Sequence, residues 1–153
     1  MDKDVIISVR GTQSKENQNG NRLDLITEGR YYKMDGAYYI TYNESEVTGM
    51  EGTTTTLKVS DGVVTLIRFG AVNSQFIFEQ GQKHVSHYDT SYGAFTIGVF
   101  ANEVNVNVDD SGGEIWVDYE IEIDNSVTGE NDFHMHIREA GNMHDKHGGK
   151  WEI

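Results

Sequence analysis

Apolar and polar residues alternate along much of the chain with a period of two. The clearest stretch covers residues 114–124, where the apolar positions are Ile115, Val117, Tyr119, Ile121 and Ile123. Successive side chains of a strand point to opposite faces, so this alternation is typical of a strand with one buried and one solvated face. We therefore predict a β-strand here and exclude a helix.

Short turn signals divide the chain into ten such stretches. Asn-Gly or Asp-Gly pairs stand at 19–20, 35–36 and 61–62, and further Gly-containing turns stand at 79–81, 109–113 and 128–129. An Asn-Gly or Asp-Gly pair between apolar runs indicates a β-hairpin. Val and Ile number 26 against 9 for Leu and Ala, which also favours strands. The predicted strands cover 4–13, 22–33, 37–45, 53–60, 63–69, 74–80, 83–89, 93–108, 114–124 and 131–138.

The stretch 93–108 contains a change of phase. Its apolar residues stand at odd positions up to Val99 but at even positions from Val104. One extra residue near 101–103, in a β-bulge, would keep both sets on the core side. Many short strands with short turns predict an all-β fold, an antiparallel up-and-down β-barrel of about eight to ten strands. We expect one barrel domain over 1–138 and a loosely ordered tail over 139–153.

Charge and composition restrict the classes of partner and of binding site that the chain can have. The 153 residues carry a formal net charge of −13, and no Lys or Arg lies between Lys83 and Arg138. Such a chain repels nucleic acid and anionic membranes, so neither is an expected partner. Cys is absent, which excludes disulfides and thiolate metal sites. The first residues lack the pattern of a secretory signal, so we expect a cytoplasmic protein.

Arg68 is the first candidate for a functional residue. It shares a strand face with Val64 and Leu66, and a guanidinium inside a barrel is a clamp for a carboxylate or phosphate. The sequence does not decide which face of this strand points inward, because Val63 and Phe69 make the other face apolar too. With neighbouring strands it would form a polar interior cluster of Tyr42, Glu44, Thr56, Lys58, Arg68 and Tyr88. The alternative, which we favour on residue type alone, is that Arg68 and Lys58 pair with acids and fix the strand register.

Histidines form a weaker candidate. His134 and His136 point to one face of a predicted strand, a spacing found among zinc and nickel ligands. A metal site needs three or four converging ligands, and no acidic residue at a fixed spacing completes a known pattern. Surface histidines are the favoured interpretation, and no cofactor is expected.

A set of residues from the centre of the chain resembles the YwiB-like family of small bacterial proteins, a domain of unknown function (1934) among the lipocalin-like, or calycin-like, barrels. The resemblance covers about residues 5 to 137 and is carried by Tyr42-x-Glu44, Gly49, Thr56-x-Lys58-Val59, Asp61-Gly62, Arg68-x-Gly70-Ala71-Val72, Phe78-x-x-Gly81, His87-Tyr88 and Tyr92-Gly93. It implies a barrel of eight to ten strands in a cytoplasmic protein and implies no activity. The Gly-x-Trp of true lipocalins is absent near the first strand, so their ligand transport is not carried over.

Three functions follow from these patterns. The leading one is an intracellular barrel that binds a small polar or anionic ligand in its interior through Arg68. The second is a protein-interaction or assembly module with a filled interior, which would associate, with copies of itself or others, through an edge strand or an exposed face. The third is an enzyme that uses Glu44, His87 or a histidine metal site. Barrels host unrelated functions, so the fold does not choose among them.

Overall fold

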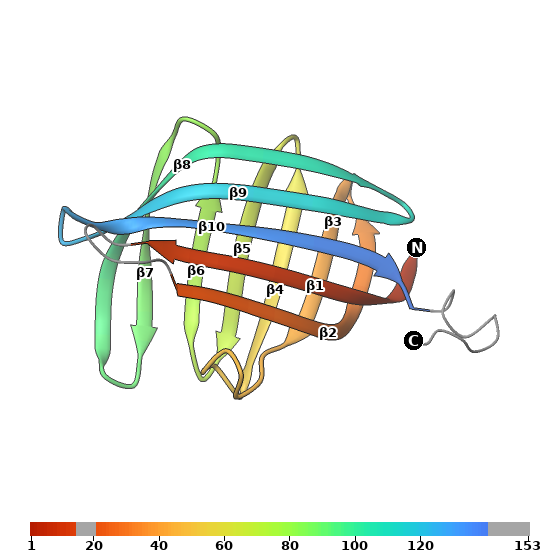
Figure 1. Ribbon diagram of the computed structural model, residues 1–153, viewed down its shortest axis with the longest axis horizontal. Coiled ribbons are helices and arrows are strands. Elements are labelled where there is room, and N and C mark those ends of the chain that lie inside the picture. Colours follow the sequence, from red (N-terminus) through yellow and green to blue (C-terminus); the bar gives the residue numbers. More distant parts are fainter. Residues whose placement is uncertain (15–20, 141–153) are drawn as a thin grey trace.

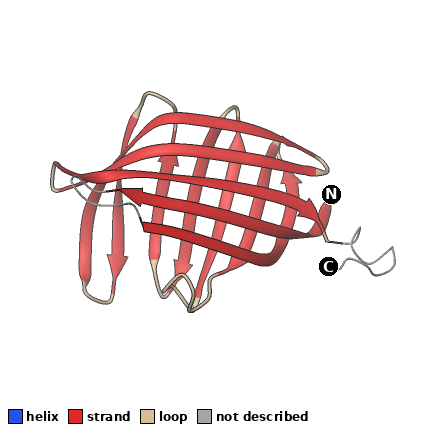
Figure 2. Ribbon diagram, in the orientation of Figure 1, coloured by secondary structure: helices blue, strands red, loops and turns tan. Residues whose placement is uncertain are grey.

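The computed structural model describes residues 1–14 and 21–140, and these form ten antiparallel strands and no helix (Figures 1 and 2). No segment of this part of the chain is a helix able to cross a membrane. The strands are β1 (Asp2–Ser14), β2 (Asn21–Met34), β3 (Ala37–Asn43), β4 (Thr53–Ser60), β5 (Val63–Gly70), β6 (Asn73–Phe78), β7 (Lys83–Thr90), β8 (Gly93–Asp109), β9 (Gly112–Ile123) and β10 (Ser126–Glu139).

Each strand pairs with the next along the chain, and β1 pairs with β10 to close the barrel. This confirms the predicted up-and-down antiparallel barrel. Two of the expected turns, 35–36 and 61–62, have an Asp followed by a Gly, both with positive φ. That is the conformation of the two-residue hairpin turns whose twist matches the strands they join.

The last hairpin differs from the prediction. We expected a turn at 128–129 and a strand only from 131, but β10 begins at Ser126. The turn is made instead by Asp124 and Asn125, which both take positive φ, and the register shifts between Val127 and Gly129. The other end of β10 includes Glu139, which pairs with Val5. The remainder of the predicted tail, from 141 on, lies outside the described residues.

The core is built by alternate residues of all the strands that line the interior. On β9, Ile115 and Val117 are fully buried, and the three later apolar residues of the predicted face pack against the core as well. Within the core, an aromatic cluster forms around Phe78, whose ring contacts Phe76, Tyr119 and Phe133. Burial of apolar area at about 25 cal/mol per Å² makes this interior the main source of stability.

Two of the long strands, β8 and β2, each contain one special backbone position. The register of β8 shifts between Ala101 and Glu103, so the predicted bulge is confirmed. At Gly29 in β2, a Cβ would lie 2.5 Å from Thr41 O, so only Gly lets the two backbones approach this closely. In Figure 1 the strands β8, β9, β10, β1 and β2 run across the view, while β3 to β6 cross behind them at a steep angle.

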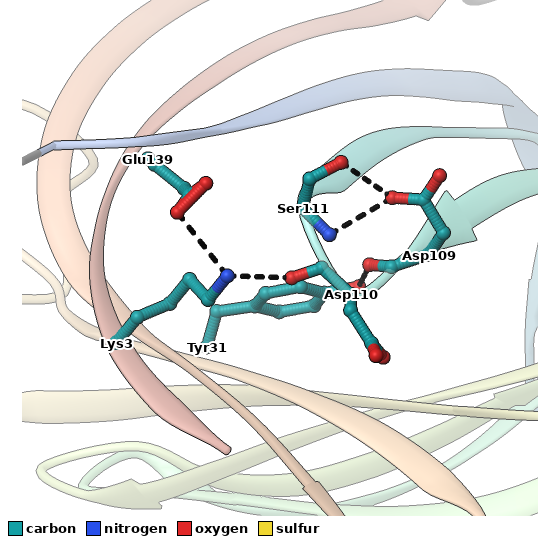
Figure 3. A network of polar contacts seen from close by, with 6 residues as sticks. All are labelled: Lys3, Tyr31, Asp109, Asp110, Ser111 and Glu139. Atoms are coloured by element: carbon teal, nitrogen blue, oxygen red, sulfur yellow. Dashed lines mark hydrogen bonds and ion pairs between the residues drawn. The ribbon is translucent and has the colours of Figure 1, made fainter. Parts of the chain in front are cut away.

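The β8–β9 turn is tied to the first residues of the chain by polar contacts (Figure 3). The buried Tyr31 hydroxyl donates to the carbonyl of Asp109 at 2.6 Å, and Lys3 Nζ donates to the carbonyl of Asp110 at 2.7 Å. Lys3 also pairs with Glu139 at 3.2 Å. Inside the turn, the Ser111 N–H and hydroxyl both donate to the Asp109 carboxylate. This end of the barrel is therefore closed by satisfied hydrogen bonds.

Candidate functional site

A row of polar side chains crosses the interior of the barrel near the last residues of β1, away from the β8–β9 turn. The strand register aligns Tyr42 on β3 with Thr55 on β4, Thr55 with Arg68 on β5, and Arg68 with Ser74 on β6. All four residues stand at inward-facing positions of their strands. On β5, Arg68 continues the series of the buried Val64 and Leu66. The open question about Arg68 is thereby answered, since its side chain points inward.

Glu44 joins this row from the connection after β3. Its backbone N–H donates to Thr53 O at 2.8 Å, which keeps the chain alongside β4 and turns the carboxylate inward. Thr55 Oγ1 donates to Glu44 Oε2 at 2.5 Å, and Arg68 Nε lies 3.9 Å from the same oxygen. The Glu44 side chain is 1% exposed and that of Arg68 18%. The two charges are paired electrostatically but are too far apart for a hydrogen bond.

The row contains every buried side-chain atom without a hydrogen-bond partner in the described part of the chain. These atoms are Glu44 Oε1, Arg68 Nε and Ser74 Oγ. Buried polar groups are almost always satisfied, because an unsatisfied one costs about 1–3 kcal/mol. Three such atoms in one cluster indicate a site that is not optimised for stability alone.

A cavity of about 280 Å³ lies against the row and is open to solvent. Its polar walls include Tyr42, Glu44, Arg68 and Tyr119. Its apolar walls include Val9, Leu25, Leu57, Leu66, Phe133 and Met135. It extends to the last residues of β1, the first of β2 and Thr48 in the β3–β4 connection. The cavity therefore opens at the barrel end away from the network of Figure 3.

Two tyrosines of the cavity have shifted pKa values. Burial raises the pKa of the Tyr42 hydroxyl above its usual range, and the Glu44 carboxylate raises it further, while Arg68 opposes both. Burial likewise raises the pKa of Tyr119, again against Arg68. Both hydroxyls stay protonated at neutral pH and can donate hydrogen bonds. The charge of Arg68 acts on both rings across the cavity.

Three of the six residues proposed for the interior cluster come together. Tyr42, Glu44 and Arg68 line the cavity. The predicted inward placement of Thr56 and Lys58 is wrong, because β4 buries its odd-numbered residues, and the Thr56 hydroxyl contacts that of Thr41 at 2.9 Å instead. The backbone of Tyr88 pairs with Ser74 across β6 and β7, and its side chain lies outside the described residues.

Thr55 and Ser74 were missed, although a signal for them exists. Leu57 and Val59 follow Thr55 in phase, and Phe76 and Phe78 follow Ser74 in phase. In each strand the large apolar residues mark the inward phase, and a hydroxyl residue continues that phase towards the cavity end. Residue type alone does not distinguish Thr55 from Thr56, whereas the phase set by Leu57 and Val59 does.

The histidine pair lies on the outside of the barrel. His134 forms a hydrogen bond with Glu114 and stacks on Trp116, at 4.9 Å between ring centroids, while His136 is exposed on the same face. Nowhere in residues 1–14 and 21–140 do three or more His, Asp or Glu side chains group closely enough to hold a metal ion. His87 is exposed on β7, so it does not join Glu44 either.

Comparison with known proteins agrees with this fold. The chain is 25% identical over 122 residues to the uncharacterized beta-barrel protein YwiB of Bacillus subtilis (strain 168), a match that covers 80% of this chain and 81% of the relative. The crystal structure of the ywiB protein from Bacillus subtilis superposes with a TM-score of 0.81, at 20% identity, over 91% of this chain and 93% of that one. The model of the domain of unknown function DUF1934 matches residues 7–135, and the chain therefore belongs to this family of β-barrel proteins.

Proposed function

We propose that this protein binds a small anionic ligand inside the barrel, with Arg68 as the anchor for its negative charge. The observation that carries the proposal is an inward-facing guanidinium, with a buried and unsatisfied Nε, at the wall of an open cavity. An Arg presents five N–H donors in a planar fork that fits an oxyanion, and Glu44 takes none of them within hydrogen-bonding distance.

The charges around the cavity favour a ligand with a single negative charge. Arg68 faces one buried carboxylate, Glu44, and Asp132 lies at the cavity wall as well. Arg22 also lies at the cavity wall, but it is exposed and pairs with Asp24 at 3.3 Å. A phosphate monoester would bring close to two negative charges at neutral pH, which Arg68 beside two acids does not neutralise. A carboxylate brings one charge and two acceptor oxygens, which matches the two terminal nitrogens of an Arg.

The rest of the cavity specifies an apolar and small body. Leu57, Leu66, Phe133 and Met135 line it, so a hydrocarbon chain or ring would displace water from apolar walls. The volume of about 280 Å³ corresponds to about nine water molecules at ~30 Å³ each. The proposed ligand class is thus a small monocarboxylate with an aliphatic or aromatic body.

The test compares carboxylates with uncharged analogues of the same shape. Hexanoate and benzoate would be titrated against hexanamide and benzamide, with binding followed by ligand-observed NMR. We expect only the carboxylates to bind, and we expect Arg68→Met to remove the difference. Arg10→Met is the matched control, since Arg10 is exposed on the outer face and pairs with Asp24. Equal binding of acids and amides, or an unaffected Arg68→Met variant, would contradict the proposal.

Native mass spectrometry of freshly purified protein provides an independent measurement. A retained ligand should appear as a mass increment in the wild type that is lost in Arg68→Met and kept in Arg10→Met. The increment should correspond to a compound that fits the cavity. A retained compound that is equally abundant in all three proteins would place its binding away from Arg68 and contradict the assignment.

A further inference from the structure

The second half of β8 has a neighbour on one side only. Residues 97–109 pair with β9, and the pairing with β7 on the other side ends at Phe100. From Glu103 to Asp109, none of the strands in the described part of the chain pairs with the side that faces away from β9. We name this side the free edge of β8; it lies beyond the first residue of β7, Lys83, and in Figure 1 this half of β8 runs across the upper part of the view.

The backbone groups of the free edge can be assigned from one hydrogen bond. The Val104 N–H donates to Gln80 Oε1 at 3.0 Å, away from β9. In an antiparallel strand the N–H and C=O of one residue point to the same side, and the side alternates along the chain. The N–H and C=O of Val106 and Val108 therefore point outward too. The Gln80 amide takes the place of a strand carbonyl at Val104, and within residues 1–14 and 21–140 the Val106 and Val108 N–H groups have no such partner.

Side chains beside the free edge alternate in character. Val104, Val106 and Val108 face the core but are only partly buried, whereas Asn105 and Asn107 are exposed on the outer face. A strand added here would need apolar side chains on its inward face, where they would pack beside the three partly buried Val residues of β8. Its alternate side chains would face outward over the surface of β8 and β9.

That outer surface is acidic. Glu103 pairs in register with Asp118, and Asn107 pairs with Glu114, so carboxylates lie near both ends of the free edge, on either side of the pair Asn105 and Trp116. Glu114 also forms a hydrogen bond with His134, and β8 and β9 themselves carry no Lys or Arg. A second copy of the chain fits poorly, because antiparallel self-pairing centred on Val106 sets Glu103 opposite Asp109, and like charges directly opposite are destabilising. A partner with Lys or Arg at its outward positions is complementary.

We propose that the free edge of β8 binds an extended, basic segment of a partner protein as an added strand. The recognised pattern alternates apolar residues with Lys or Arg over about seven residues. Backbone hydrogen bonds to Val106 and Val108 hold the segment, and the acids of β8 and β9 select its charge. This site is separate from the cavity and does not depend on the ligand proposed for it.

The experiment uses capped, fluorescein-labelled heptapeptides and the full chain. The probe Lys-Val-Lys-Val-Lys-Val-Lys is compared by fluorescence anisotropy with its isomer Lys-Lys-Val-Val-Val-Lys-Lys and with a version N-methylated at the three Val residues. We expect the alternating peptide to bind about tenfold more tightly than either, since two lost hydrogen bonds correspond to about one decade in Kd. The Val106 and Val108 amides should exchange more slowly with solvent when it is bound.

Variants of the chain provide the matched controls. Val106→Pro removes the outward N–H, and Pro is tolerated on an edge strand where that N–H makes no ladder bond. The loss of one hydrogen bond should weaken binding of the alternating peptide about threefold, whereas Val106→Thr, which keeps the N–H and the shape, should not. The N-methylated peptide tests the same hydrogen bonds on the wild-type chain, so the test holds even where the Pro variant misfolds.

Three outcomes would overturn the proposal. Equal binding of the alternating and the isomeric peptide would reduce it to unspecific attraction of a polycation. Unchanged exchange of the Val106 and Val108 amides would move any binding away from the edge. Self-association of the wild type that Val106→Pro abolishes would make a second copy the occupant.

Discussion

Replacement of Arg68 should destabilise the barrel more than replacement of its partner Glu44. The two charges are 3.9 Å apart, which corresponds to an attraction of about 4 kcal/mol at an effective dielectric constant of 20. Arg68→Met leaves a carboxylate that is 1% exposed without a counter-charge, and we expect the free energy of unfolding to fall by about 3 kcal/mol. Glu44→Gln leaves a guanidinium that reaches the cavity and its water, and we expect a loss of about 1 kcal/mol.

The double variant shows whether these losses share one cause. With both charges gone, no isolated charge remains, so Arg68→Met with Glu44→Gln should lose about 2 kcal/mol and not the sum of the single losses. Urea unfolding followed by circular dichroism at neutral pH measures all four proteins. Single losses that add to within about 0.5 kcal/mol would refute the pairing. A larger loss for Glu44→Gln than for Arg68→Met would refute the asymmetry drawn from burial.

Three further predictions concern the frame around the site. Gly29→Ala places a Cβ against the side chain of Ile7 on β1 and the carbonyl of Thr41 on β3, and should lower the free energy of unfolding by about 2 kcal/mol. Gly11→Ala, whose new Cβ would lie no closer than 3.7 Å to a neighbouring atom, should not lower it. Urea unfolding compares the two variants. Tyr31→Phe removes the hydroxyl donated to the β8–β9 turn at 2.6 Å and should cost about 1 kcal/mol in the same assay, with faster amide exchange in that turn. The hydrogen bond to Asp110 raises the pKa of Tyr38 to about 12, and a raised folded pKa means that this stabilisation is complete below pH 10 and is lost as the pH rises towards 12. The urea midpoint of the wild type should fall over that window more steeply than that of Tyr38→Phe.

Strand positions and topology could be derived from the sequence because their signals are local. Period-two alternation marks each strand, Asp-Gly pairs mark tight turns, and a phase change marks the bulge in β8. The error at the last hairpin has the same origin. Asp124-Asn125 and Thr128-Gly129 are both turn sequences, and only pairing with β9 decides which of them reverses the chain. The residues of a turn alone therefore do not show which of two neighbouring turn sequences reverses the chain.

The site was harder to derive because it depends on facing and register together. Val63 and Val64 are both apolar, so the phase of β5 was open, and with it the direction of Arg68. In the run Thr53–Thr56, residue type is constant and phase is the whole difference between inside and outside. Thr56 was therefore assigned to the interior in place of Thr55. The cavity is harder still to predict from the sequence, since its volume depends on the separation of strands, which no local pattern specifies.

The two ends of the barrel treat polar groups in opposite ways, and this contrast supports a binding role for one of them. At the β8–β9 end, Tyr31 and Lys3 donate to backbone carbonyls of the turn, so polarity there stabilises closure. At the cavity end, Glu44, Arg68 and Ser74 each keep a buried atom without a hydrogen bond. Apolar residues of similar volume would often be as stable or more so in such a row. Of these three residues, Glu44 and Arg68 line the cavity, so a molecule bound there that supplies their missing hydrogen bonds would account for a polar row at the end where the cavity opens.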